Sequence, residues 1–184
     1  MNLILHTTKI RYRILSQAYR NFIRANEEVL DVGCGNGIIT KLIQDDFQTN
    51  ITGCDINYYL IYKLPFISIK NRRLNKIKKR FNIAMLNDVL HHISKDKQEQ
   101  ILTDCLKIAD KILIFEAEPT IYGKLADIIL NKHHYHSLKT PLSFRKVNEW
   151  QAMFKKMNLK YSMLKPGKPF WYPFSHIAFC VHKT

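Results

Sequence analysis

Apolar residues recur along this chain with two different spacings. Between residues 10 and 24 they fall at i, i+3, i+4, i+7 and i+8, with arginines on the opposite side, which predicts an amphipathic helix. Helices are also predicted over 38–47 and 95–110, where apolar residues share one helical face. Short apolar runs predict strands at 29–32, 51–56, 66–69, 81–86 and 112–115. Because strands alternate with helices in this part of the chain, we expect a parallel α/β sheet.

The pattern changes after Pro119. Apolar positions predict one more helix over 122–130, and a polar segment follows it. Ser143 is a favourable N-cap for a later helix whose apolar face runs from Phe144 to Met157. Two final strands and the turn between them complete the pattern: 161–164, Pro166-Gly167-Lys168-Pro169 and 177–181. Such a pair of strands would close the sheet as an antiparallel hairpin.

The composition is that of a globular domain. The 184 residues are 46% hydrophobic and 24% charged, which excludes a disordered, collagen-like or disulfide-stapled chain. No apolar stretch is long enough to span a bilayer, and Lys9 and Arg11 follow the N-terminal apolar residues before a signal-peptide core can form. The four cysteines are well separated, without a CxxC pair, and are expected to be reduced. We therefore expect one domain, located in the cytoplasm.

The chain carries a large positive charge. Lys and Arg total 29 against 15 Asp and Glu, which gives a net charge of +14. Such a charge attracts polyanions such as nucleic acid, anionic lipid surfaces or phosphorylated substrates. A Lys-, Ile- and Asn-rich usage inherited from an AT-rich genome explains the charge equally well. The segment 70–80 holds seven basic residues and no acidic one, and is either a solvated face or a contact for an anionic partner.

The glycine-rich sequence Asp31-Val32-Gly33-Cys34-Gly35-Asn36-Gly37 lies between the first predicted strand and the next helix. Glycines there let backbone amides approach a ligand at the carboxyl edge of the sheet. Asp55 ends the second strand, where a carboxylate can accept both hydroxyls of a ribose. Ile38 stands where a dinucleotide fingerprint needs its third glycine, and no P-loop motif is present. The pattern favours a ligand that carries ribose but no pyrophosphate.

The order of these motifs resembles that of the class I S-adenosylmethionine-dependent methyltransferases. Residues 29–37 are similar to the first motif of that family, and Asp55 matches its ribose-binding acidic residue. Residues 81–93 resemble the family's fourth-strand motif, and 143–154 resemble a helix found in many small-molecule members. The resemblance implies a single Rossmann-like, doubly wound α/β sheet. That sheet would be mostly parallel with a C-terminal antiparallel hairpin and would have helices on both faces.

The resemblance also implies a role for each matching residue. Asp31 and the 33–37 loop would hold the methionine part of S-adenosylmethionine. Asp55 would bind the ribose hydroxyls, with Ile56 beside the adenine. Asn87 would line the methyl-donor pocket at the end of the fourth strand. The full set implied to bind the cofactor is Asp31, Gly33, Cys34, Gly35, Asn36, Gly37, Asp55, Ile56, Asn71, Asn87 and Leu90.

One position departs from the family pattern. Many members have an acidic residue after the third strand that binds the adenine amino group. The sequence here reads Asn71-Arg72-Arg73, and we expect Asn71 to make the hydrogen bond instead.

The function implied is transfer of a methyl group to a small-molecule or lipid acceptor. Leu86-Asn87-Asp88-Val89 stands where nucleic-acid amino methyltransferases carry an Asn-Pro-Pro-Tyr-type motif, which disfavours that activity. Two alternatives remain open. The chain could be an RNA-directed methyltransferase that uses 70–80, or a non-catalytic cofactor-binding partner subunit. The expected parts are an N-terminal helix (1–28), a cofactor-binding core (29–118), a lid over the acceptor (119–142), and a helix with the closing hairpin (143–184).

A general base is needed only if the acceptor must lose a proton. His91, after the fourth strand, and His134, in the polar segment, are the candidates. His133, His134 and His136 could suggest a metal site, but zinc normally takes three or four ligands and no cysteine lies near them in the sequence. We predict no metal.

Overall fold

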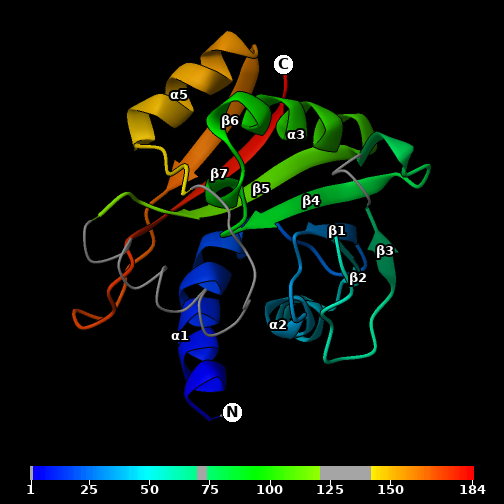
Figure 1. The fold of residues 1–184 in the computed structure, drawn as a ribbon, viewed down its shortest axis with the longest axis vertical. Helices are drawn as coiled ribbons and strands as arrows, with labels where there is room; N and C mark the ends of the chain where they lie inside the picture. The colour runs from blue at the N-terminus through cyan, green and yellow to red at the C-terminus, as the bar shows by residue number, and fades with distance from the viewer. Residues whose placement is uncertain (1, 70–73, 121–141) are drawn as a thin grey trace.

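The computed structural model describes residues 2–69, 74–120 and 142–184. Within these ranges a seven-stranded sheet crosses the molecule in the order β3-β2-β1-β4-β5-β7-β6 (Figure 1). The strands are β1 (Glu28–Val32), β2 (Asn50–Asp55), β3 (Phe66–Ser68), β4 (Phe81–Asn87), β5 (Ala109–Ala117), β6 (Leu159–Leu164) and β7 (His176–Lys183). The predicted Rossmann-like sheet is confirmed.

The direction of the last strands decides which residues meet at the ligand-binding edge. Strands β1 to β5 pair in parallel, so their carboxyl ends lie at one edge of the sheet. Strand β7 runs antiparallel between β5 and β6, as the predicted hairpin requires. In that register His176, the first residue of β7, lies opposite Ala117, the last residue of β5. The beginning of β7 therefore belongs to the same edge as the carboxyl ends of the parallel strands.

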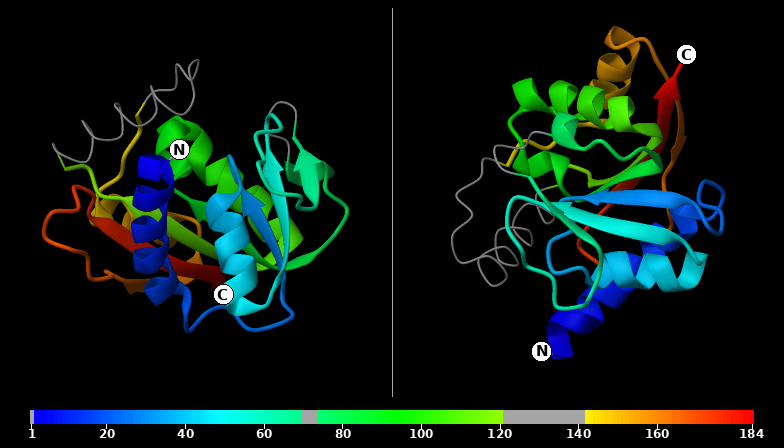
Figure 2. Two further views of the ribbon diagram at one scale, coloured as in Figure 1. Left: turned by 90° about the horizontal axis from the view of Figure 1, so that it is seen from below. Right: turned by 90° about the vertical axis from the view of Figure 1, so that its right-hand side faces the viewer.

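Helices cover both faces of the sheet (Figure 2). On one face α3 and α5 bury apolar residues such as Leu102 and Trp150. On the other face α1 and α2 bury residues such as Leu15 and Ile43. The helices are α1 (Asn2–Tyr19), α2 (Ile38–Phe47), α3 (Lys95–Ile108) and α5 (Val147–Lys156), and the 3-10 turns are η2 (Leu74–Lys76) and η3 (Leu90–His92). No helix in the described ranges is both long and apolar enough to cross a membrane.

Two boundaries differ from the sequence prediction. Helix α1 covers Asn2–Tyr19 rather than 10–24. Helix α3 ends at Ile108, and the predicted last turn at 109–110 belongs to β5 instead. Ala109 pairs with Phe81 of β4, so the ladder hydrogen bonds of a buried strand compete successfully with the local helical pattern.

The prediction that Ser143 caps the late helix is wrong. Helix α5 begins at Val147, and Lys146 holds the N-cap position, with its backbone N–H donating to Glu149 Oε2 at 2.8 Å. Ser143 instead donates its backbone N–H to the His91 carbonyl at 2.7 Å, which ties this segment to the turn after β4. The predicted helix at 122–130 lies outside the described residues, as does the segment 121–141 of the predicted lid.

Candidate functional site

The glycine loop after β1 makes a turn that only glycine can adopt without strain. Gly33, Gly35 and Gly37 have φ values of 76°, 52° and 75°. A Cβ on Gly33 would lie 2.0 Å from Cγ2 of Val89, and one on Gly37 would lie 2.5 Å from Cδ2 of Leu60. The loop is thus pressed against the segments that follow β4 and β2, and its amides are presented at the carboxyl edge of the sheet.

Asp55 is fixed in position by the glycine loop. The backbone N–H of Gly35 donates to its Oδ2 at 3.0 Å, and that of Ile56 donates to Oδ1 at 2.7 Å. The Oδ1 of Asn36 accepts from the Ile38 N–H at 3.1 Å, an Asx turn directly before α2. The end of β2 and the loop after β1 therefore form one hydrogen-bonded unit. A carboxylate fixed at the end of β2 in this way is suited to bind the hydroxyls of a ribose.

Asp31 lies beneath the loop in a buried hydrogen-bond chain. Its Oδ2 accepts from the Thr40 hydroxyl at 2.6 Å, and its Oδ1 accepts from the Asn87 amide at 3.3 Å. The Tyr19 hydroxyl donates to Asn87 Oδ1 at 2.7 Å. Burial raises the pKa of Asp31 to about 6, although Thr40 and Asn87 work against that rise. The chain of contacts joins α1, β1, α2 and β4 directly under the expected cofactor position.

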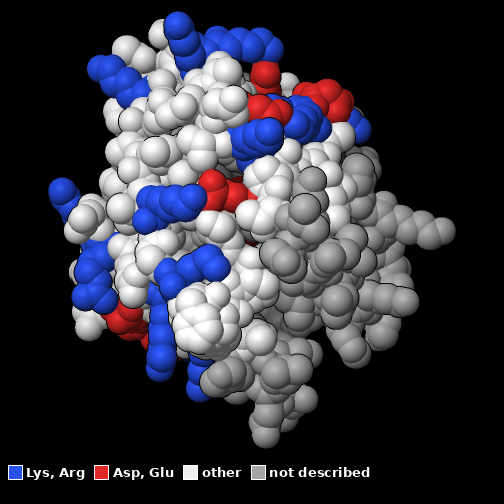
Figure 3. Space-filling model, turned by 90° about the vertical axis from the view of Figure 1, so that its left-hand side faces the viewer, with Lys and Arg blue, Asp and Glu red and all other residues white. Residues whose placement is uncertain are grey.

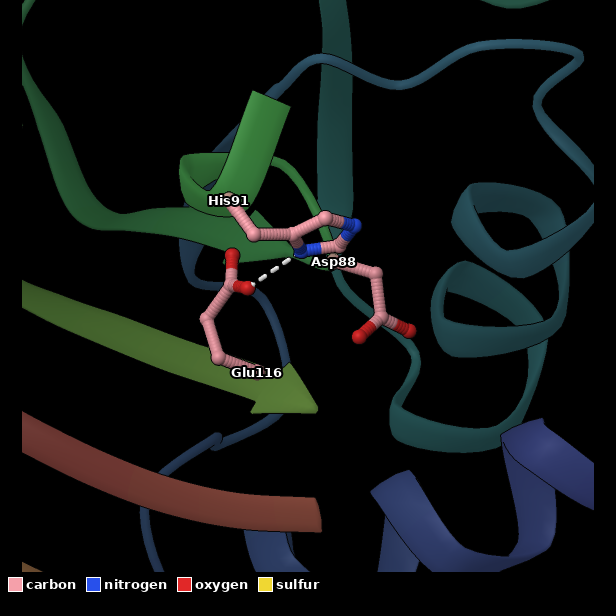
Figure 4. A group of neighbouring side chains, drawn as sticks. All are labelled: Asp88, His91 and Glu116. Atoms are coloured by element: carbon pink, nitrogen blue, oxygen red, sulfur yellow. Dashed lines mark hydrogen bonds and ion pairs between the residues drawn. The ribbon is translucent and has the colours of Figure 1, made fainter. Parts of the chain in front are cut away.

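Glu116 organises the segment that follows β4 (Figure 4). Its Oε1 accepts the backbone N–H groups of Val89 and Leu90 at 2.8 and 2.6 Å. Its Oε2 lies 2.6 Å from Nδ1 of His91, whose ring stacks on Phe144 with centroids 4.6 Å apart. His91 is thus held inside the turn after β4, which favours a structural role over its predicted role as a general base.

Asp88, His91 and Glu116 together have the composition of a metal site, with ligand atoms within 4.8 Å of one another. Both oxygens of Glu116 are already engaged by backbone amides and by His91. Figure 4 shows the Asp88 carboxylate directed away from this pair. We therefore interpret the cluster as a hydrogen-bonded support for the turn, and the absence of a metal remains a prediction.

Asp88 forms a second, separate network at the same edge. Its Oδ2 lies 3.2 Å from Nη1 of Arg11, and its Oδ1 lies 3.3 Å from Nε2 of His176. Burial alone would raise the pKa of Asp88, but its contacts with His176 and Arg11 outweigh it and hold that pKa well below its usual range. Asp88 has a φ of 53°, a conformation uncommon for a non-glycine residue and frequent at functional sites.

His176 is the most informative residue that the sequence did not single out. It is buried, it stacks on Phe115 with ring centroids 4.3 Å apart, and Nε2 is the nitrogen that faces Asp88. Its other nitrogen, Nδ1, is buried and has no hydrogen-bond partner within the described part of the chain. A carboxylate beside one nitrogen orients the ring, and the second nitrogen is a buried polar atom without a partner, which makes His176 a candidate proton acceptor.

The remaining predicted residues fall into three groups. Cys34 is half-buried beside β2, where burial raises the pKa of its thiol. Leu90 is fully buried against α3 and the sheet, under the edge rather than on it. Asn71 and His134 lie outside the described residues.

A pocket of about 620 Å³ opens beside the carboxyl ends of the strands. Glu118, directly after β5, accepts from the Ser175 hydroxyl at 2.6 Å and pairs with Lys165 at 2.7 Å. Partial burial works to raise the pKa of Glu118, but Lys165 and Ser175 outweigh it and lower that pKa. The pocket is lined by Glu118, Pro119, Thr120, Lys146, Val147, Asn148, Gln151, Lys165 and Ser175.

Comparisons with known proteins point to one family. The model of the family described as "Methyltransferase domain" matches residues 7–162. A search of the curated proteins gave no match.

Three solved structures illustrate the shared fold. Magnesium protoporphyrin IX methyltransferase from Synechocystis PCC 6803 with bound SAH is 14% identical with a TM-score of 0.66, covering 98% of this chain and 84% of that one. A SAM-dependent methyltransferase from Archaeoglobus fulgidus is 14% identical with a TM-score of 0.69, covering 96% and 94%. A cyclopropane-fatty-acyl-phospholipid synthase-like protein from Lactobacillus casei is 12% identical with a TM-score of 0.67, covering 96% and 90%. The chain belongs to the methyltransferase domain family and is an S-adenosylmethionine-dependent methyltransferase.

Proposed function

We propose that this methyltransferase acts on a small-molecule or lipid acceptor bound at the carboxyl edge of the sheet, between the glycine loop and β7. The observation that carries the proposal is the convergence of two sets of residues at one edge. Asp55 and the glycine loop form the donor side, linked by the 3.0 Å contact between Gly35 and the carboxylate. Asp88 and His176 form the acceptor side, next to the pocket lined by Glu118.

The residues on the donor side suit the cofactor. When bound, S-adenosylmethionine supplies a methyl group that is already activated by a positively charged sulfur. The protein's remaining task is to hold donor and acceptor in line, and alignment of this kind contributes roughly 7–11 kcal/mol in well-oriented reactions. In our proposal Asp55 holds the ribose hydroxyls, the 33–37 loop holds the methionine part, and Ile56 lies beside the adenine. Asn87, fixed by Asp31 and Tyr19, borders the methyl group.

On the acceptor side we assign His176 as the proton acceptor. For a hydroxyl acceptor, Nδ1 of His176 would receive the proton that the hydroxyl loses on methylation, once the acceptor has displaced the side chains that cover this buried atom. His91 also has one nitrogen beside a carboxylate, that of Glu116, but the same carboxylate holds the backbone of the turn after β4, so we assign His91 to that turn. The charged and titratable groups around His176 are Asp88 and Arg11, with Glu118 after β5 and Tyr172 in the preceding loop.

A small or lipid acceptor is favoured over RNA by the position of the basic segment. Residues 78–80 lead into β4 and therefore lie at the amino edge of the sheet, opposite the ligand-binding edge. Two of their charges are already paired, Lys79 with Glu28 at 2.7 Å and Arg80 with Asp110 at 2.7 Å. Of the four basic residues in the described part of 70–80, two are thus already paired, and residues 78–80 lie away from the donor side.

The donor side can be tested without knowing the acceptor. Calorimetric titration with S-adenosylmethionine should show binding, and Asp55→Ala should weaken it roughly 10- to 100-fold, the effect of losing hydrogen bonds to a charged group. Asp110→Asn is the matched control, because Asp110 is an exposed carboxylate at the opposite edge. Equal affinities for wild type and Asp55→Ala would contradict the proposed ribose contact. A screen of small-molecule and lipid acceptors with isotopically labelled methyl donor would then define the substrate.

A further inference from the structure

The loop 165–175 between β6 and β7, which we call the docking loop, exposes two large aromatic side chains. Phe170 is 96% exposed and Trp171 is 56% exposed. Met163 and Leu164, at the end of the adjoining strand β6, are also exposed. Scattered apolar side chains are normal on a protein surface, but a group of large ones on a single hairpin marks an interaction site.

The docking loop is fixed in shape although its tip is exposed. The Lys168 ammonium donates to the Tyr172 carbonyl at 2.5 Å, and the Tyr172 N–H donates to the Pro169 carbonyl at 3.1 Å. The Tyr172 side chain is buried and lies against Phe174 and His176, with ring centroids 5.5 and 6.0 Å away. The tip is therefore anchored from beneath, so presenting its aromatic side chains to a partner costs little conformational entropy.

The charge around the tip has one sign. Residues 165–175 include Lys165 and Lys168 and no acidic residue. Lys165 is paired with the carboxylate of Glu118, whereas Lys168 has no carboxylate partner among the described residues. The loop projects from the side of the molecule drawn in Figure 3, where Lys and Arg side chains are spread over the described surface and Asp and Glu are fewer. An anionic partner would complement this face.

We propose that the docking loop binds the surface of an anionic lipid bilayer. Phe170 and Trp171 enter the interface between headgroups and acyl chains, where aromatic side chains are favoured, and the lysines contact the headgroups. Basic residues near an anionic membrane strengthen its binding, and the chain's net charge of +14 adds long-range attraction. Bases could also stack on exposed aromatics, but the neighbouring Met163 and Leu164 match hydrocarbon rather than nucleotides.

The position of the docking loop connects membrane binding to catalysis. The loop leads directly into His176 and carries Ser175 and Lys165 of the pocket beside Glu118. A bilayer bound there would lie next to the acceptor side of the site. A membrane-borne acceptor follows from this arrangement, and that consequence rests on the proposed function.

Tryptophan fluorescence offers a direct test, because the two tryptophans differ in exposure. Trp150 is 2% exposed in the core, so a change in emission on adding vesicles reports on Trp171. We expect a blue shift with vesicles of equimolar phosphatidylcholine and phosphatidylglycerol, and no shift with phosphatidylcholine alone. Raising the salt concentration should weaken the binding, since the lysine contribution is screened.

Co-sedimentation with the same vesicles tests whether the exposed aromatic residues of the docking loop are needed for membrane binding. Phe170→Ser/Trp171→Ser should bind at least roughly tenfold more weakly than wild type. The matched control is Tyr58→Ser/Ile61→Ser, because these two exposed apolar residues follow β2, towards the other end of the sheet. It should bind vesicles as wild type does. Calorimetry with S-adenosylmethionine on the docking-loop variant should give the wild-type affinity, which separates this proposal from the cofactor assignment.

Three results would overturn the proposal. One is equal sedimentation of wild type and the docking-loop variant with anionic vesicles. Another is binding to single-stranded RNA, but not to vesicles, that is lost in the docking-loop variant. The third is a dimer in analytical ultracentrifugation that the same substitutions dissociate, with no vesicle binding by the wild type.

Discussion

The Asn87 amide donates to the Asp31 carboxylate at 3.3 Å, and this buried contact joins the carboxyl ends of β1 and β4 through side chains. The Tyr19 hydroxyl holds the other side of the same amide, at 2.7 Å from Asn87 Oδ1. The amide therefore has fixed donor and acceptor directions, and the two strands that border the donor side are positioned relative to each other by polar as well as apolar contacts.

Asp31→Asn should change how stability depends on pH. The pKa of Asp31 is raised from 3.8 to about 6, so the folded state binds more protons than the unfolded state between these values. The free energy of unfolding should therefore fall, by at most about 3 kcal/mol, as the pH rises through this window. The variant has no such carboxyl group. Urea unfolding between these two pH values should show that Asp31→Asn becomes more stable relative to wild type as the pH increases. If the free energies of unfolding of the two proteins changed with pH in parallel, Asp31 would not be a buried carboxylate with a raised pKa.

Gly33→Ala should destabilise the fold by roughly 2 kcal/mol or more, because it combines a positive φ with a clash. The added Cβ would meet Val89 Cγ2 at 2.0 Å. Val89→Ala removes that atom, so the double variant should recover part of the loss. Gly167→Ala is the control, since no atom lies within 4 Å of its would-be Cβ. Thermal unfolding of the four proteins measures both effects, and equal losses at Gly33 and Gly167 would contradict the close approach of the loops.

Glu116→Ala should cost roughly 2–5 kcal/mol, because it leaves two buried backbone N–H groups without their acceptor. Those donors belong to Val89 and Leu90. Glu118→Ala, two residues further on in a more exposed position, should cost much less. Chemical denaturation of both variants provides the comparison. If the two losses were similar, the turn after β4 would not depend on Glu116.

His176→Gln should lower kcat by roughly 10²- to 10⁴-fold with a hydroxyl acceptor found in the screen, as expected for loss of a general base. The affinity for S-adenosylmethionine should remain that of the wild type, because His176 lies on the acceptor side. His182→Gln is the control, since His182 is exposed near the other end of β7. A drop in cofactor affinity equal to the drop in kcat would indicate a structural role instead.

Local sequence was sufficient to predict where the glycine loop and Asp55 lie, while their role in binding the cofactor stays a prediction. The three glycines of the loop have positive φ, a conformation that the residue type itself indicates. Asp55 is the last residue of β2, the next strand along the chain. The glycine loop and Asp55 can therefore both be predicted from short stretches of sequence. The alternation of apolar runs likewise predicted most strands to within a few residues. These predictions hold because parallel strands buried on both faces leave a continuous apolar signature.

The residues of the proposed acceptor side could not be predicted from short stretches of sequence. His176 meets Asp88 only because β7 inserts antiparallel between β5 and β6, and no spacing in the sequence specifies that order. Glu116 offered a weaker signal, as a polar residue near the end of an apolar strand. The prediction that Ser143 caps a helix was wrong. Its side chain suits that position, but its backbone N–H instead donates to the carbonyl of His91 in the turn after β4. For His176, Glu116 and Ser143 alike, contacts with residues far apart in the sequence determine the role of the residue.

The insertion of β7 between β5 and β6 also sets an order of events during synthesis on the ribosome. Strand β6 is made before β7, yet its only partner within the described sheet is β7, so it cannot join the sheet first. Until β7 is complete, β5 keeps an open edge and Asp88 lacks its histidine partner. The nascent chain can therefore assemble the donor side early, whereas acceptor chemistry must wait for the final strand to emerge.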